Sequence, residues 1–345
     1  MLKFIGKRIL LFIPVILGVL FIVFTINYFT PSDPVYAILG MNVSPEDYAA
    51  KEEELGLNDP FFVQFFSYVK NIVTKLDLGQ SYGNKRPVMD QILERCPKTL
   101  LLGAIGMLIT VVIGIPCGII SATKQHSVLD YSVTGVSLLF ASVPNFWLAL
   151  MLVILFSKHL GWLPATGIKT WQGWILPCLT LGLGPLANVT RITRSSMLDV
   201  VRQDYIRTAR AKGLNERQII FKHALRNALI PVVTVIGFML SMIMGGSAVI
   251  EGIFNFPGIG SMMMSAIATA DYPLIQGSIV FISLFVCVIN LLIDILYGFI
   301  DPRIKAQYFD VHNELAHKYN YKLSASVFRR ILPFLGFKPY SVFEE

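Results

Sequence analysis

The sequence predicts an all-α polytopic membrane protein with six transmembrane helices, and three observations support this fold class. Hydrophobic residues make up 54% of the 345 residues and charged residues only 15%, against about 25% in a soluble domain. Six nearly uncharged runs are each long enough to cross about 30 Å of hydrocarbon as a helix. The alternating pattern of a membrane β-barrel is missing. The runs are residues 9–29, 99–123, 131–157, 170–190, 227–250 and 272–293.

The first run has the alternative of being a secretory signal peptide, but its length and surroundings favour a retained span. It has 21 residues, and the sequence Thr30-Pro31-Ser32-Asp33 follows it without a small-x-small cleavage motif. We therefore expect residues 1–30 to form the N-terminus and the first transmembrane helix.

Lysine and arginine are distributed unevenly between the loops, which predicts the orientation in the cell membrane. With both termini in the cytoplasm, 20 of the 29 basic residues lie inside and nine outside. Seven of those nine fall in the long segment 30–98, where the positive-inside rule is weak. We therefore expect cytoplasmic N- and C-termini. Because the basic excess follows this topology, nucleic acid is not an expected partner.

The segment of residues 31–97 is predicted to form a small extracytoplasmic loop domain. Its first half is acidic, and the apolar residues of the stretch 61–73 recur at the spacing of an amphipathic helix. A packed surface loop without a binding role is the alternative interpretation.

The connection between the fourth and fifth runs predicts a bent, basic helical segment on the cytoplasmic side. Residues 198–212 contain no Pro or Gly, Gly213 ends this predicted helix, and Asn215 is placed to cap a second helix over residues 217–229. Small side chains near the bend would let another protein approach the backbone, and anchoring to anionic lipid explains the segment equally well. These small residues are Thr208, Ala209 and Ala211.

This segment resembles the cytoplasmic signature of binding-protein-dependent ABC importer permeases, and in particular of their dipeptide/oligopeptide/nickel group. The resemblance rests on Asp204-Tyr-Ile-Arg-Thr-Ala-Arg-Ala-Lys-Gly213-Leu and on His223-Ala-Leu-Arg-Asn-Ala-Leu-Ile-Pro231. Of these, Ala209, Gly213 and Leu225 agree with the general signature, whereas the remainder is similar to the narrower group. Further landmarks of the group match residues 31–35, 55–60, 77–81, 86–88, 251–260, 271–277 and 301–303.

The resemblance implies a type I ABC importer permease fold, with its core at residues 98–305 and a coupling helix at about residues 200–214. It implies that this helix docks on a cytoplasmic ATPase. It also implies four kinds of partner: a second homologous permease subunit, two cytoplasmic ATP-binding subunits, an extracytoplasmic solute-binding protein and the lipid bilayer. The coupling residues would be Asp204, Arg207, Thr208, Ala209, Arg210, Ala211, Gly213 and Leu214.

The implied function is ATP-driven import of short peptides by alternating access, with import of nickel or another small solute as the alternative. The sequence contains no Gly-x-x-x-x-Gly-Lys-Ser/Thr motif, so ATP and Mg²⁺ are expected on the partner subunits. The four cysteines are isolated from one another, so we expect no metal site and no cofactor in this chain. We therefore expect a transport subunit and not an enzyme.

Two other function classes fit the sequence less well. A stand-alone secondary transporter would need paired ionisable residues within its spans, and only Asp294 approaches this. An intramembrane enzyme would need a catalytic constellation at membrane depth, whereas all five histidines lie outside the apolar runs. Substrate-binding residues are not predicted from the sequence.

Several further residues have two interpretations each. Glu251, Pro257, Gly258, Asp271 and Tyr272 flank the last outer loop and are candidates for an outer gate or a contact with the binding protein, with a solvated cap as the alternative. The cytoplasmic tail, residues 306–345, mixes bases with large apolar residues and would contact lipid or a partner. Helix-weakening residues of the fourth and fifth runs either line the transport path or allow close helix packing. They are Pro177, Gly182, Gly184, Pro185, Pro231 and Gly237.

Overall fold

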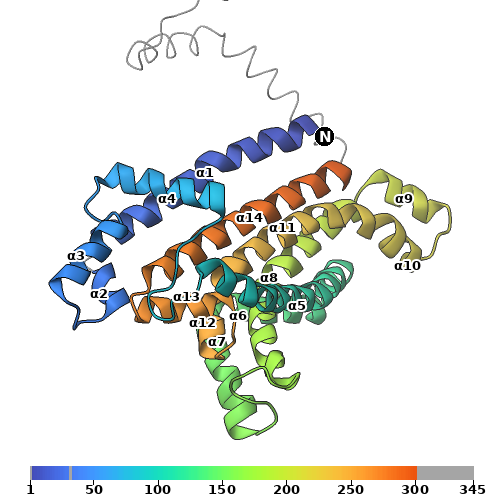
Figure 1. Cartoon of the computed structure of the whole chain (residues 1–345). Helices are drawn as coiled ribbons and strands as arrows, with labels where there is room; N and C mark the ends of the chain where they lie inside the picture. The colour runs from blue at the N-terminus through green and yellow to red at the C-terminus, as the bar shows by residue number, and fades with distance from the viewer. Residues whose placement is uncertain (1, 31–32, 301–345) are drawn as a thin grey trace, which may run out of the picture. The chain divides into compact units, whose positions relative to one another are not determined.

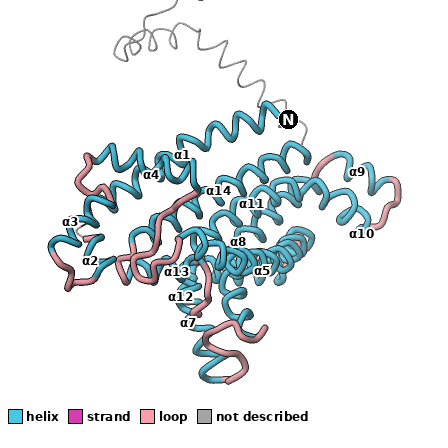
Figure 2. The backbone as a smooth tube through the Cα atoms, in the orientation of Figure 1, coloured by secondary structure: helices cyan, strands magenta, loops and turns pink. Residues whose placement is uncertain are grey.

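The computed structural model describes residues 2–30 and 33–300, and the expected tail at residues 306–345 lies outside them. Every regular element of this part of the chain is helical, apart from one isolated β-bridge between Gln80 and Pro87 (Figures 1 and 2). The chain divides into two compact units, Met1–Ile293 and Asp294–Glu345, and the contacts discussed below lie within the first.

Five helices in the described part of the chain are long and apolar enough to cross a membrane. One of them is a composite in which a π-helical turn, η2, joins two α-helices, and it continues through Pro231. The five are α1 (Leu2–Phe29), α5 (Val88–Thr123), α8 (Gln172–Val201), the composite of α10 (Glu216–Gln218), η2 (Ile219–Ala224) and α11 (Leu225–Gly246), and α14 (Tyr272–Ile300).

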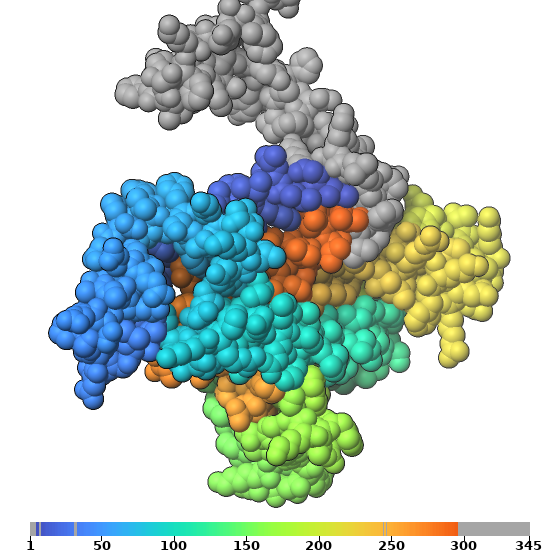
Figure 3. All heavy atoms as spheres, viewed as in Figure 1, coloured from blue at the N-terminus to red at the C-terminus, as the bar shows by residue number. Residues whose placement is uncertain are grey.

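The third predicted span, residues 131–157, is not one continuous helix. It is divided into α6 (Val128–Ser142) and the pair α7 (Asn145–Leu152) and η1 (Val153–His159), which are bent by 101° to each other. Pro144 explains the break, because the residue before a proline is driven out of the helical region. Val143 is accordingly extended, with φ −88° and ψ 125°. In Figure 3 the residues around position 150 (green) protrude at the lower end of the view.

The fourth helix is longer than predicted, and the predicted helix over residues 198–212 is divided. α8 continues past residue 190 to Val201, and α9 (Asp204–Ala211) begins after Gln203, whose backbone is extended at φ −71° and ψ 149°. Neither Pro nor Gly marks this break. The start of α9 is supported by Asp204, a negative charge in the first turn of the helix.

Glycines allow α5 and α8 to pack closely. A Cβ atom added at Gly118 would lie 2.5 Å from Thr193 Cβ, and one at Gly182 would lie 2.7 Å from the carbonyl oxygen of Gly106. Gly237 is equally tight, because an added Cβ would lie 2.7 Å from Ile293 Cγ1. Close packing is therefore the role that the structure gives to Gly182 and Gly237.

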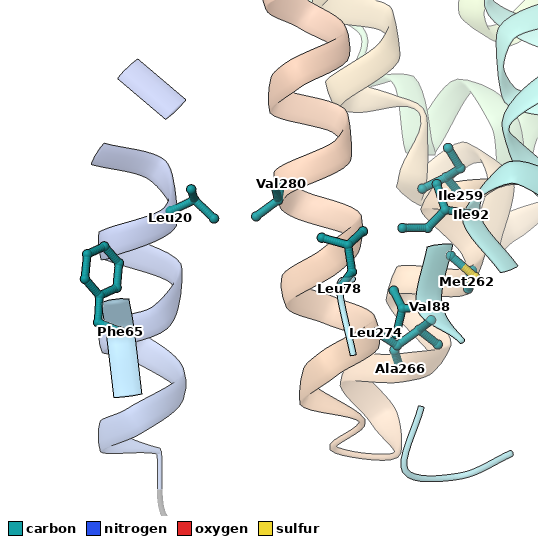
Figure 4. Close-up of a cluster of buried hydrophobic side chains, with 10 residues drawn as sticks. All are labelled: Leu20, Phe65, Leu78, Val88, Ile92, Ile259, Met262, Ala266, Leu274 and Val280. Atoms are coloured by element: carbon teal, nitrogen blue, oxygen red, sulfur yellow. The ribbon is translucent and has the colours of Figure 1, made fainter. Parts of the chain in front are cut away.

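The segment after α1 contains α2 (Pro34–Leu39), α3 (Pro45–Glu54) and α4 (Phe61–Lys75). α4 confirms the predicted amphipathic helix, because Phe65 is buried against Phe21 and Phe24 of α1, with ring centroids 5.5 Å from each. Figure 4 shows the cluster that Phe65 and Leu20 share with residues of α5, α13 (Ile259–Ala268) and α14. Met262 packs in this cluster, as expected of an adaptable hydrophobic side chain.

Candidate functional site

The bend that is predicted to be the coupling element begins with the eight-residue helix α9, which packs against the protein along one side only. Ile206 is completely buried and Ala209 is 8% exposed, and both pack with Met197, Ile119 and Ile219. Every other residue of α9 is exposed. Because residues three apart lie on the same side of a helix, Ile206 and Ala209 form the seat of α9 and the remaining surface is open.

The turn after α9 is fixed by backbone conformation and by side-chain hydrogen bonds. Gly213 has φ +77°, a left-handed conformation that glycine adopts without strain. Asn215 Oδ1 accepts a hydrogen bond of 2.8 Å from the Gln218 backbone N–H, which confirms the predicted N-cap. Arg210 Nε lies 2.8 Å from Glu216 Oε1 across the turn, and this hydrogen bond raises the pKa of the Arg210 guanidinium.

The expectation that Thr208, Ala209 and Ala211 together form an accessible small-residue face needs correction. Thr208 and Ala211 are exposed, whereas Ala209 points into the protein's own core, because it follows the apolar residue Ile206 by three positions. The residues of the predicted coupling set that are open to a partner are Asp204, Arg207, Thr208, Arg210, Ala211, Gly213 and Leu214.

A second candidate region surrounds Glu251, a residue of α12 (Ala248–Ile253) that is completely buried. Oε1 accepts hydrogen bonds from Thr99 Oγ1 at 2.9 Å and from Ser247 Oγ at 3.1 Å, and Oε2 accepts one from the Ser261 backbone N–H at 3.0 Å. Thr99 Oγ1 in turn accepts from the Ile259 N–H at 2.9 Å. The carboxylate thus joins α5 and α12 to the N-terminus of α13, where a negative charge is favourable.

A second buried carboxylate, that of Asp271, binds the segment that follows α4. Its oxygens accept hydrogen bonds from the Ser81 hydroxyl, from the Tyr82 N–H at 3.2 Å and from the Gly83 N–H at 3.3 Å. Two of the sequence landmarks, residues 77–81 and 271–277, therefore lie in contact. Burial and the nearby Asp271 raise the pKa of Tyr82 to about 12.

These contacts correct the interpretation of Glu251 and Asp271 as a solvated cap. Both are buried, Asp271 being 4% exposed, and their oxygens bind the chain's own residues. Gly258 is also buried, and an added Cβ would lie 2.3 Å from Glu251 Oε2. Pro257 and Tyr272 are half-buried, so they retain some surface at this end of the molecule.

The structure also reveals an ion pair that sequence reasoning missed. Arg194 of α8 donates from Nε and Nη2 to the two oxygens of Asp130 of α6, each at 2.9 Å. Ser121 of α5 donates to the same carboxylate. The predicted spans placed Asp130 just before the third run and Arg194 in the loop after residue 190, so the two residues were not expected to pair.

The comparisons with known proteins agree with this geometry. Residues 114–306 match the family described as binding-protein-dependent transport system inner membrane component, and residues 1–103 match its N-terminal counterpart. The dipeptide transport system permease protein DppB of Alkalihalophilus pseudofirmus is 42% identical over 333 residues, which cover 88% of this chain and all of that protein. The oligopeptide transport system permease protein AppB of Bacillus subtilis is 40% identical, with 88% of this chain and all of AppB covered.

A third relative, the glutathione transport system permease protein GsiC of Escherichia coli, is 40% identical over 88% of this chain and 99% of its own. Among solved structures, an inward-facing conformation of the MetNI methionine ABC transporter matches with a TM-score of 0.52 and 19% identity. The match covers 62% of this chain and 97% of that chain, and it supports the fold.

The helices and the exposed bend define a permease subunit of an ABC importer with the type I permease fold. The chain belongs to the family of binding-protein-dependent transport system inner membrane components. It is therefore a multi-pass membrane protein and a transport subunit, not an enzyme, and ATP is hydrolysed by separate subunits. Its partners include an ATPase and a solute-binding protein, and the predicted family and fold are confirmed.

Proposed function

We propose that this chain imports short peptides that an extracytoplasmic binding protein delivers. The observation that carries the proposal is the identity of about 40% along nearly the whole chain to permeases named for dipeptides, oligopeptides, di/tripeptides and glutathione. All of these named substrates contain peptide bonds and a free carboxylate, although they differ in length and side chains. We therefore propose short peptides as the substrate class and do not assign one particular peptide sequence.

The proposed assembly contains a second homologous permease and two cytoplasmic ATP-binding subunits, which carry the ATP and Mg²⁺, and this chain binds no cofactor of its own. Both termini lie in the cytoplasm, which the positive-inside distribution of Lys and Arg supports. This orientation places α9 and its turn in the cytoplasm and α2 to α4 outside.

In this orientation, we infer that α9 transmits the movement of the ATPases. Its exposed residues provide the contact, and its buried side belongs to a cluster with residues of α5, α8 and α11. A force on α9 therefore reaches three spanning helices through packed side chains. ATP-bound ATPases would favour one of two states of the permease by binding it better, which is the requirement for alternating access.

The test of the substrate class begins with the binding protein of the same system. The solutes that it captures are identified by mass spectrometry, and uptake of each one is then measured in proteoliposomes that contain the complete transporter, binding protein and ATP. We expect uptake of short peptides that depends on both ATP and the binding protein. Capture and uptake of nickel or another non-peptide solute instead would contradict the proposal.

A further inference from the structure

Two cavities meet where α6 and α8 face each other (helices labelled in Figure 1). One, of about 550 Å³, lies along α6 and α8, and the other, of about 420 Å³, lies at the break between α6 and α7 and reaches α11. Ala141 and Asn188 line both, so the two cavities adjoin. Together they extend from Arg202, just beyond the end of α8, to the irregular backbone at Pro144.

The lining of this double cavity is apolar for the most part, with a few polar and charged side chains placed along it. Arg191 and Asn188 of α8 and Asn145 of α7 all line it. An added Cβ at Gly184 would lie 2.5 Å from Asn145 Oδ1, so glycine at this position leaves room for the amide. Irregular backbone and charged side chains are tolerated at membrane depth where they line a cavity, and they commonly mark a substrate path.

The two arginines of α8 that line the cavity differ in their partners. Arg194 donates two hydrogen bonds from one edge of its guanidinium, from Nε and Nη2, to Asp130, which is 3% exposed. Arg191 is exposed, and within residues 33–300 its one hydrogen bond is to the neutral Asn188 Oδ1, at 2.9 Å. At 1.5 Å per residue, Arg191 lies about 15 Å along α8 from Val201. Among residues 2–30 and 33–300, no carboxylate forms an ion pair with this cation.

We propose that the double cavity is this chain's part of the peptide path and that Arg191 binds the terminal carboxylate of the passing peptide. A guanidinium binds a carboxylate through two parallel hydrogen bonds, and the side-chain amides of Asn188 and Asn145 match peptide N–H and C=O groups. The proposal rests on peptide import being the function. It assigns different roles to neighbouring arginines: Arg194 holds α6 to α8, and Arg191 contacts the substrate.

An anionic lipid headgroup offers the same negative charge, and a second permease could cover the same face. Two side-chain amides favour a peptide over a lipid, because Asn188 and Asn145 continue the hydrogen-bonding groups beyond the arginines to the break at Pro144, where an acyl chain would have no use for them.

The first experiment measures whether the cavity is an aqueous path. In a variant without the four native cysteines, Asn188→Cys is introduced into the complete transporter, and a hydrophilic, membrane-impermeant thiol reagent is applied to inside-out vesicles. We expect modification, slowed severalfold by a saturating transported peptide. No modification, as expected beneath lipid or a second subunit, or modification at the same rate with and without peptide, overturns the proposal.

The second experiment compares Arg191→Gln, Arg191→Lys and the control Lys124→Gln, which removes an exposed cation outside the cavity. Uptake is measured for a free peptide and its C-terminally amidated form, both at concentrations that saturate the binding protein. Arg191→Gln should lower uptake of the free peptide about tenfold or more, change the amidated form much less, and leave ATPase co-purification intact. Arg191→Lys should retain part of the preference.

An equal loss for both peptides in Arg191→Gln, with normal assembly, overturns the role of Arg191. This result is distinct from failure of the proposed function, because in that case the unmodified transporter would import neither peptide.

Discussion

Two regions were predicted from the sequence to contact another protein, the predicted cytoplasmic bend around α9 and the predicted outer loop with its carboxylates Glu251 and Asp271, but the structure exposes the polar groups of the first and buries those of the second. Around α9 almost every polar side chain is exposed and only Ile206 and Ala209 are buried. At the outer loop, Glu251 and Asp271 are buried and their hydrogen bonds go to the chain's own residues. The outer carboxylates therefore stabilise this chain, whereas the bend keeps its polar groups available to another one.

This comparison predicts that substitutions at the outer carboxylates act on stability, with the largest effect at Glu251. Glu251→Ala removes an acceptor from the hydroxyls of the buried Thr99 and Ser247 and from the partly buried Ser261 N–H. Because the loss of a partner costs a buried group about 1–3 kcal/mol, we expect a total loss of about 3 kcal/mol. The measurement is the thermal unfolding midpoint of the purified protein in detergent. An unchanged midpoint would show that the carboxylate is not a structural link.

Asp271→Asn should have a smaller effect of the same kind. The amide keeps one acceptor oxygen but loses the charge that holds the Ser81 hydroxyl and two backbone N–H groups. We expect a loss of about 1–3 kcal/mol, together with faster proteolysis of the segment after α4. Glu94→Gln is a matched control, because Glu94 forms only an exposed ion pair with Arg86 and should change stability by less than about 1 kcal/mol. Equal sensitivity of the two variants would contradict the assignment.

Structural features could be predicted from the sequence where residues close together in the chain determine them. Spans and caps follow from neighbouring residues, so α1, α4 and the Asn215 cap were predictable. The break at Pro144 and the burial of Ala209 were local signals as well, from the proline itself and from Ile206 three positions earlier. The pairings of Asp130 with Arg194 and of Asp271 with residues 81–83 join distant segments. No local pattern specifies such pairs, so they required the structure.

Within the bend, Gly213→Ala tests the turn rather than the surface. A non-glycine residue at φ +77° costs roughly 1–2 kcal/mol, which is too little to unfold the protein but enough to shift the position of α9 against α10. We expect a near-normal unfolding midpoint with reduced transport. Gly245→Ala is the matched control, because Gly245 is an exposed residue of α11 where an added Cβ meets nothing within 4 Å. Full transport by Gly213→Ala would show that the turn geometry is not needed.

We expect a substitution at Ala211 to have the smallest effect on stability but a large effect on binding of the ATPase. Ala211 is exposed, whereas Ala209 on the same helix is buried. Ala211→Glu places a charge in solvent and should change stability by no more than about 0.5 kcal/mol, yet it should abolish co-purification of the ATPase by blocking close approach to α9. Ala209→Glu should also lose the ATPase, but with a lowered unfolding midpoint, because an unpaired charge is costly to bury. The two variants distinguish the exposed surface of α9 from its buried side. If Ala211→Glu retains the ATPase and only Ala209→Glu loses it, α9 is a packing element and the contact with the ATPase lies elsewhere.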